Sequence, residues 1–202
     1  MTTVGLGPPA DAAALLFDCD GTLVDSLSLY RICWRQVYGR AGFEMADEWF
    51  DTRVGLTVHK FVRAALPEAD EATLARVQDE GMNMFMDSIH LIEPLEHVVD
   101  VARQYHGRLP MAVVSSGIAP AVHKSLAAVG ITDLFDFVVT LESVQESKPA
   151  PDGYLHAIAR LGVPASRCVA YEDSRDGIAS ALAAGVGTVF DVRGAGSRVV
   201  TA

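Results

Sequence analysis

The chain has 202 residues, of which 50% are hydrophobic and 21% are charged. This is the usage of an ordinary soluble globular protein, and it excludes a disordered chain and a collagen-like fibre. A chain of this length buries roughly 70% of the surface that its unfolded form exposes, so it can hold a substantial core as one domain, with or without an insert. The formal net charge of -10 argues against nonspecific binding to nucleic acid.

Cysteine usage and hydropathy set the expected compartment. The chain has three cysteines, Cys19, Cys33 and Cys168. This odd number, without Cys-x-x-Cys spacing, predicts neither a disulfide framework nor a zinc site and favours the reducing cytoplasm. The first ten residues hold no basic residue, and the apolar run Ala12–Phe17 is too short for a signal-peptide core. The uncharged stretch Gly177–Phe190 is shorter than the roughly 18 residues that predict a membrane span, so we expect a cytoplasmic protein without one.

The first predicted strand is followed by a long helical segment. The apolar run Ala13–Phe17 predicts a buried strand that ends in an acidic turn. From Ser26 to about Ile92 no convincing strand occurs, and apolar residues recur at helical spacing, as at Leu74 and Val77. We interpret this segment as an insert of about four helices. The predicted domains are therefore a core of residues 1–25 and 93–202 and a helical cap domain of residues 26–92.

After the insert, strands and helices alternate. Four further runs rich in Val, Leu and Phe predict strands at Met111–Val114, Phe137–Thr140, Cys168–Tyr171 and Thr188–Val192. Three helical patterns, each followed by a glycine that fits a C-terminal cap, occur at Ala119–Val129, Tyr154–Leu161 and Ser174–Ala184. Strands that alternate with helices predict an α/β fold with a parallel sheet covered on both faces.

Polar groups stand at or shortly after the ends of the predicted strands. They are Asp18 and Asp20, then Ser115 and Ser116, then Lys148, and finally Glu172 and Asp173. In open α/β sheets the ligand crevice lies outside the carboxyl ends of the strands, so we expect the fold to bring these groups together. Several carboxylates, one ammonium group and hydroxyls suit a hard divalent cation together with a phosphate.

Each of these motifs has a simpler interpretation when it is taken alone. The Asp-Gly-Thr sequence that starts at Asp20 is often only a turn, and Ser115 is most often a helix cap. A lone lysine such as Lys148 is usually a solvated surface residue. Glu172 and Asp173 can cap the helix that follows them. The occurrence of all four motifs in one chain favours the functional interpretation.

The order of the motifs extends over nearly the whole chain. Asp-x-Asp-Gly-Thr at Asp18–Thr22 is followed by Ser115, by Lys148-Pro149 and by the paired acids Glu172-Asp173. This pattern resembles the haloacid dehalogenase superfamily of phosphohydrolases, in the branch with a helical cap inserted after the first motif. The resemblance implies a Rossmann-like, doubly wound parallel sheet with an inserted α-helical cap domain, and Mg²⁺ as the cofactor.

The resemblance also implies catalytic and metal-binding roles. Asp18 would be the nucleophile that forms an aspartyl-phosphate, and Asp20 would be the general acid and then the general base. Mg²⁺ would be bound by Asp18, by the backbone carbonyl of Asp20 and by Asp173, with Glu172 assisting beside them.

Other residues would contact the substrate. Ser115, the backbone N–H of Ser116 and Lys148 would bind the transferring phosphoryl group. Thr22 would orient Asp20 or a phosphate oxygen. In the cap, the residues expected near the leaving group are Tyr30, Arg53 and Gly55, although a core tyrosine and a surface arginine are equally good interpretations of the first two.

Three segments favour one branch of the superfamily. Gly107–Val113, Lys148–Asp152 and Phe190–Arg193 look similar to bacterial fructose-1-phosphate phosphatases and related sugar phosphatases. We therefore predict a Mg²⁺-dependent phosphatase of a small phosphorylated metabolite, most simply a sugar phosphate. We expect it to act as a monomer or weak dimer, with neither nucleic acid nor a membrane as a partner.

Two alternatives stay open at this point. A sugar-phosphate mutase resembling β-phosphoglucomutase is the first, although Tyr30 stands where that family has a cap histidine, and Gly117 and Ile118 stand where it has a lysine. A noncatalytic regulator that binds metal and phosphate is the second, although none of the four motifs has lost its polar residue. Ser147 stands where many relatives have glycine, and the sequence assigns it no role.

Overall fold

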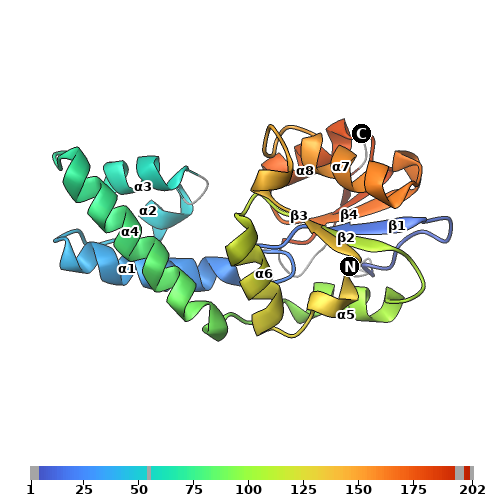
Figure 1. Ribbon diagram of the computed structural model, residues 1–202, viewed down its shortest axis with the longest axis horizontal. Helices are drawn as coiled ribbons and strands as arrows, with labels where there is room; N and C mark the ends of the chain where they lie inside the picture. The colour runs from blue at the N-terminus through green and yellow to red at the C-terminus, as the bar shows by residue number, and fades with distance from the viewer. Residues whose placement is uncertain (1–4, 54–55, 194–197, 201–202) are drawn as a thin grey trace. The chain divides into compact units, whose positions relative to one another are not determined.

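The contacts within the chain define two compact units. A computed structural model describes residues 5–53, 56–193 and 198–200. The first unit is drawn from the segments Met1–Asp25 and Ile92–Ala202, and the second from Ser26–Leu91. The first unit is built on a sheet and the second is helical (Figure 1).

The first unit contains a six-stranded sheet in the order β3-β2-β1-β4-β5-β6. The strands are β1 (Ala14–Phe17), β2 (Met111–Val114), β3 (Phe137–Val139), β4 (Cys168–Glu172), β5 (Thr188–Asp191) and β6 (Arg198–Val200). The first five pair in parallel, and β6 pairs antiparallel with β5. The five predicted strands and their parallel arrangement are confirmed, and the antiparallel edge strand β6 is an addition that the sequence analysis missed.

Helices cover both faces of this sheet. They are α5 (Glu96–Tyr105), α6 (Ala119–Ala128), α7 (Asp152–Leu161) and α8 (Arg175–Ala183), with short 3-10 turns η2 (Thr132–Leu134), η3 (Leu141–Ser143) and η4 (Ala165–Arg167). Helices α7 and α8 lie on one face and α5 and α6 on the other (Figure 1). Three glycines were predicted to end helices, and all three have positive φ: Gly130, Gly162 and Gly185. Helix α5 was not predicted from the sequence.

Packing at the centre of the sheet aligns the strand ends. All four side chains of β1 are buried, because its Ala-Leu-Leu-Phe sequence is apolar toward both faces. Phe17 stands opposite Tyr171 in the ladder, and Tyr171 stands opposite Phe190. Their rings stack with centroid distances of 4.7 Å and 5.2 Å. The residues that follow β1, β4 and β5 therefore leave the sheet side by side.

The second unit is held together by aromatic side chains. Its described residues form α1 (Ser26–Arg40), α2 (Asp47–Asp51), α3 (Val58–Ala65), α4 (Glu71–Ser88) and the 3-10 turn η1 (Ile89–Leu91). Trp34, Tyr38 and Phe61 are fully or almost fully buried and contact one another through their rings. A Cβ on Gly81 would lie 2.5 Å from the Trp34 ring, so glycine lets α4 approach α1 closely. None of the helices in the described ranges has the length and apolar character needed to cross a bilayer.

Candidate active site

Backbone pairing continues for one residue beyond the strands and fixes the first site residues. The N–H of Asp18 donates to the carbonyl of Tyr171 at 3.0 Å, and the N–H of Ser115 donates to that of Val139 at 2.9 Å. Asp18 and Ser115 therefore start their loops at the same edge of the sheet. This is the carboxyl edge, where the sequence analysis expected the polar motifs to gather.

The turn after β1 is shaped around Asp173. The chain reverses at Gly21, which has a φ of +82°. A Cβ on Gly21 would lie 2.2 Å from Asp173 Oδ2, so only glycine leaves room for that carboxylate. Thr22 is fully buried, and its hydroxyl donates to Asp173 Oδ1 at 3.4 Å. The predicted substrate residue Thr22 is thus closed off from solvent and supports the carboxylate of the last motif.

Lys148 connects the motifs across the sheet edge. Its Nζ donates to Asp18 Oδ1 at 2.6 Å, to Glu172 Oε1 at 2.6 Å and to the carbonyl oxygen of Val114 at 2.7 Å. The Lys148 side chain is only 8% exposed. Burial lowers the pKa of Lys148, but the neighbouring carboxylates of Asp18 and Glu172 more than offset this and hold the pKa above its ordinary value. Lys148 is therefore a buried cation held by three acceptors.

Glu172 is the most enclosed of the acids. It has no solvent exposure, and its Oε1 accepts hydrogen bonds from both Lys148 and the hydroxyl of Tyr154, each at 2.6 Å. The hydroxyl of Ser174 lies 3.4 Å from Oε2. A Cβ on Gly177 would lie 1.9 Å from Oε2, so glycine in α8 makes the space that this carboxylate fills. The sequence analysis selected neither Tyr154 nor Gly177, since both sit inside an ordinary helical pattern.

Three carboxylates lie close together in the site. Oxygens of Asp18, Glu172 and Asp173 all lie within 4.8 Å of one another. Burial, with repulsion from Asp18, raises the pKa of Glu172 to about 7, and the same two causes with the charge of Glu172 raise that of Asp173 to about 7. Asp18 Oδ2 is buried and has no hydrogen-bond partner among the described residues. Excess negative charge and an unpaired buried oxygen both fit a divalent cation bound by oxygen ligands.

The loop that follows β2 carries Ser115, Ser116 and Gly117, and we call it the serine loop. It lies beside Asp20. Gly117 donates its N–H to Ser115 Oγ at 2.9 Å. A Cβ on Gly117 would lie 3.2 Å from Ser115 Oγ and 3.5 Å from Asp20 Oδ2, so these two oxygens approach the same point. Ser147 donates from its hydroxyl to Ser116 Oγ at 2.8 Å. The serine that stands before Lys148 thus links the second and third motifs.

The predicted substrate residues of the helical unit have local partners. Tyr30 is half-buried, its ring contacts those of Trp34 and Phe85, and burial raises its pKa to about 12. The Arg53 guanidinium lies 4.9 Å from the centre of the Trp49 ring and donates to its carbonyl oxygen at 3.2 Å. Gly55 lies outside the described residues.

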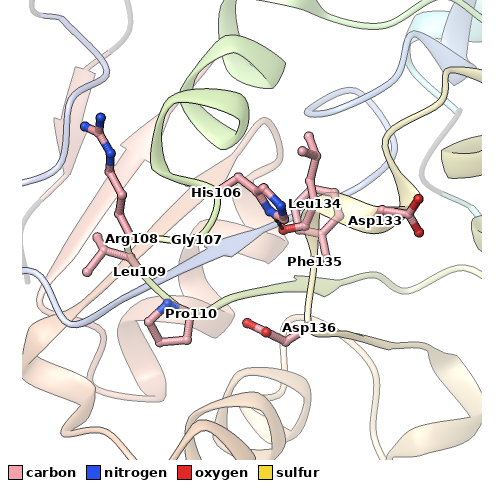
Figure 2. Close-up of a pocket in the computed structure, with 9 residues that line it drawn as sticks. All are labelled: His106, Gly107, Arg108, Leu109, Pro110, Asp133, Leu134, Phe135 and Asp136. Carbon is pink, nitrogen blue, oxygen red and sulfur yellow. Dashed lines mark hydrogen bonds between the residues drawn. The ribbon is translucent and has the colours of Figure 1, made fainter.

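A separate hollow opens at the opposite edge of the sheet. Figure 2 shows the two loops that line it, residues 106–110 and 133–136, which precede β2 and β3. Its volume is about 380 Å³. Asp136 in this hollow accepts from the N–H of Met111 at 2.8 Å and so stabilises the start of β2. None of the polar residues predicted to be catalytic lines this hollow.

Comparison with known proteins agrees with this geometry. The family model described as haloacid dehalogenase-like hydrolase matches residues 15–190. Fructose-1-phosphate phosphatase YqaB of Escherichia coli is 37% identical over 186 residues, which cover 90% of this chain and 96% of that protein. Hexitol phosphatase A of Escherichia coli is 32% identical, with 84% of this chain and 78% of that protein covered.

A solved structure shows the same fold. The crystal structure of CbbY from Rhodobacter sphaeroides in complex with phosphate has a TM-score of 0.72 at 24% identity, and the match covers 87% of this chain and 84% of that one. The family model spans most of the chain, and the identity to YqaB extends over nearly all of it. The chain therefore belongs to the haloacid dehalogenase-like hydrolases.

Proposed function

We propose that this chain is a Mg²⁺-dependent phosphatase of small phosphorylated sugars, and that Asp18 is its nucleophile. The observation that carries the proposal is the contact between Lys148 Nζ and Asp18 Oδ1 at 2.6 Å, inside a cluster of three carboxylates. The family uses Mg²⁺ and an aspartyl intermediate, and this arrangement has the residues that such chemistry needs.

The residues present fit the metal. Asp18 and Asp173 would hold it, together with the backbone carbonyl of Asp20, because hard oxygen ligands are those that Mg²⁺ prefers. Glu172 is the third carboxylate of the cluster, and its Oε1 already accepts hydrogen bonds from Lys148 and Tyr154. When bound, the metal neutralises negative charge so that an anionic nucleophile and an anionic phosphate can approach each other.

The chemistry proceeds in two steps. A carboxylate oxygen of Asp18 attacks phosphorus, the ester P–O bond breaks, and Asp20 donates its proton to the leaving alkoxide. Asp20, now a carboxylate, removes a proton from a water molecule, whose oxygen attacks the aspartyl-phosphate. The P–O bond to Asp18 breaks, inorganic phosphate leaves, and both aspartates return to their starting states.

The serine loop and Lys148 stabilise the group in transfer. Its equatorial oxygens carry the charge that develops, and donors fixed in advance stabilise that charge without reorganising. Ser115 is buried at the end of β2, and Ser116 is held by the hydroxyl of Ser147. Lys148 is fixed by its carboxylate and carbonyl partners, so its ammonium group is also in place before the phosphate arrives.

Support for a sugar phosphate comes from the curated relatives. Two that match most of the chain are named for fructose 1-phosphate and hexitol phosphate hydrolysis. Tyr30, Arg53 and Gly55 stay predictions for contacts with the leaving group. The proposal includes a cytoplasmic location, which the free cysteines Cys19, Cys33 and Cys168 support, and a monomer or weak dimer.

Phosphate release from a panel of substrates tests the proposal. The panel contains fructose 1-phosphate, hexitol phosphates, phosphoglycolate, nucleotides and β-glucose 1-phosphate, each with Mg²⁺ and with EDTA. Hydrolysis that needs both the metal and Asp18, and is lost in Asp18→Asn, supports a phosphatase. Conversion of β-glucose 1-phosphate to glucose 6-phosphate without net release would show a mutase. Metal binding without turnover of any ester would show a regulator.

A further inference from the structure

Tyr154 is a buried tyrosine whose hydroxyl is bonded to a carboxylate of the candidate active site. It lies in α7, is fully buried, and donates from its hydroxyl to Glu172 Oε1 at 2.6 Å. Its ring also lies beneath the lysine, with Lys148 Nζ 5.4 Å from the ring centre. A buried tyrosine hydroxyl needs an acceptor, and here that acceptor belongs to the carboxylate cluster of the candidate site.

The contacts form a single chain from Tyr154 to the nucleophile. Tyr154 and Lys148 both donate to Glu172 Oε1, and Lys148 donates in turn to Asp18 Oδ1 at 2.6 Å. These two donors on Oε1, with Ser174 Oγ 3.4 Å from Oε2, restrict the orientation of the Glu172 carboxylate. Because Glu172 is inaccessible to solvent, donors inside the protein set its orientation.

We propose that Tyr154 is a positioning residue for catalysis, which fixes Glu172 so that Lys148 is held against Asp18. The expected effect on kcat rests on the phosphatase function proposed above. The positioning of Lys148 is a property of the protein without metal or substrate. Without the Tyr154 hydroxyl, Glu172 keeps Lys148 as a donor but loses one of the contacts that set its orientation. Lys148 then samples positions away from the nucleophile.

The substitution Tyr154→Phe tests this with a matched control. It removes one oxygen and keeps the ring that packs in the core and lies under Lys148. The control is Tyr171→Phe, since Tyr171 is equally buried and its hydroxyl donates to the carbonyl oxygen of Leu6 at 2.8 Å, outside the catalytic cluster. Both variants lose one tyrosine hydrogen bond. That of Tyr154 is buried and meets a carboxylate, and that of Tyr171 is partly buried and meets a carbonyl, so we expect the larger fall in thermal stability in Tyr154→Phe.

Two measurements separate positioning from stability. The chain has three lysines, Lys60, Lys124 and Lys148, and only the last has a buried side chain. A ¹H–¹⁵N spectrum of the lysine ammonium groups, recorded without metal or substrate, therefore isolates Lys148 by its slow exchange with water. Steady-state kinetics with Mg²⁺ and the best substrate of the panel then give kcat and KM for each variant.

We expect the Lys148 signal to shift or broaden in Tyr154→Phe and to stay unchanged in Tyr171→Phe. We expect kcat to fall about tenfold in Tyr154→Phe, the effect of losing roughly one hydrogen bond to a charged group, with KM within twofold. An unchanged Lys148 signal, or a kcat equal to that of Tyr171→Phe, would overturn the proposal. If the wild type hydrolyses no ester, the phosphatase function fails, and a displaced Lys148 signal still supports the contact chain.

Discussion

Gly177 offers a test in which helix propensity and the geometry of the site predict opposite results. It lies in the first turn of α8, where replacement of glycine by alanine in an unconstrained helix stabilises by up to about 1 kcal/mol. A Cβ at this position would lie 1.9 Å from Glu172 Oε2 and 2.2 Å from its Cδ. Real Cβ contacts are never so short, so in Gly177→Ala the Glu172 carboxylate has to move.

The displacement of Glu172 changes the free energy of unfolding more than the helix propensity of alanine does. Glu172 Oε1 accepts from Lys148 and from Tyr154, and a move of this carboxylate weakens both contacts. Hydrogen bonds that involve a charged group contribute about 1.5–3 kcal/mol each. With the gain of about 1 kcal/mol subtracted, we expect Gly177→Ala to lower the free energy of unfolding by about 2–5 kcal/mol. We also expect kcat to fall at least tenfold, because Lys148 loses one of its two carboxylate partners.

Urea unfolding and phosphate release measure the two effects, and Gly39 supplies the control. Gly39 lies in α1, and a Cβ there would meet nothing within 4 Å. Gly39→Ala should therefore raise the free energy of unfolding by about 0.5–1 kcal/mol. If Gly177→Ala proves as stable as Gly39→Ala and keeps the wild-type kcat, Glu172 does not occupy the space beside α8, and the reasoning about Lys148 fails with it.

Three further predictions follow from the same cluster. Gly21→Ala should lose more than about 1 kcal/mol of stability in urea unfolding and most Mg²⁺-dependent turnover, because it strains a positive φ and collides with Asp173. Lys148→Met should lower the free energy of unfolding by about 3–5 kcal/mol in EDTA, because it leaves buried carboxylates unpaired. If this loss is no larger than that of a surface lysine variant such as Lys124→Met, the buried contacts of Lys148 are contradicted. In EDTA the stability should fall as pH rises from about 4 through about 7, by up to about 1.4 kcal/mol per pH unit for each carboxyl, because the pKa values of Glu172 and Asp173 are raised in the folded state. Melts from pH 5 to 8 should show a smaller slope in Asp173→Asn and a Mg²⁺ stabilisation that grows with pH, and parallel curves for the two proteins would refute this reasoning.

The sequence predicted those features that a short local pattern specifies. β1 is a run of apolar residues followed at once by Asp18, and the strand is fully buried with Asp18 at its end. The order of the four motifs predicted that Lys148 and Asp18 meet, although 130 positions separate them. The edge strand β6 has three residues, too few to show a period, and the sequence pattern did not predict helix α5.

Other side-chain partners in the site could not be predicted from the sequence. Tyr154 looks like any aromatic residue on the apolar side of a helix, and nothing in its neighbours shows that its hydroxyl meets Glu172. Ser147 had no assigned role, and its hydroxyl meets Ser116 on another loop. Thr22 was expected beside Asp20 or a phosphate, and its hydroxyl contacts Asp173. Each of these partners is fixed by how strands and helices pack, which local patterns do not encode.

The balance of charge at the sheet edge explains why one lysine needs two carboxylates. Lys148 bound to Asp18 alone would hold the proposed nucleophile in a strong pair and lower its reactivity toward phosphorus. With Glu172 on its other side, Lys148 shares its charge between two acceptors, and Asp18 keeps a second oxygen, Oδ2, without a partner among the described residues. When the three carboxylates are ionised they exceed the ammonium in charge, so a phosphate dianion would meet net repulsion without a divalent cation. On the proposed function, the charges that fix the lysine therefore account for a divalent cation with any substrate that carries a phosphate.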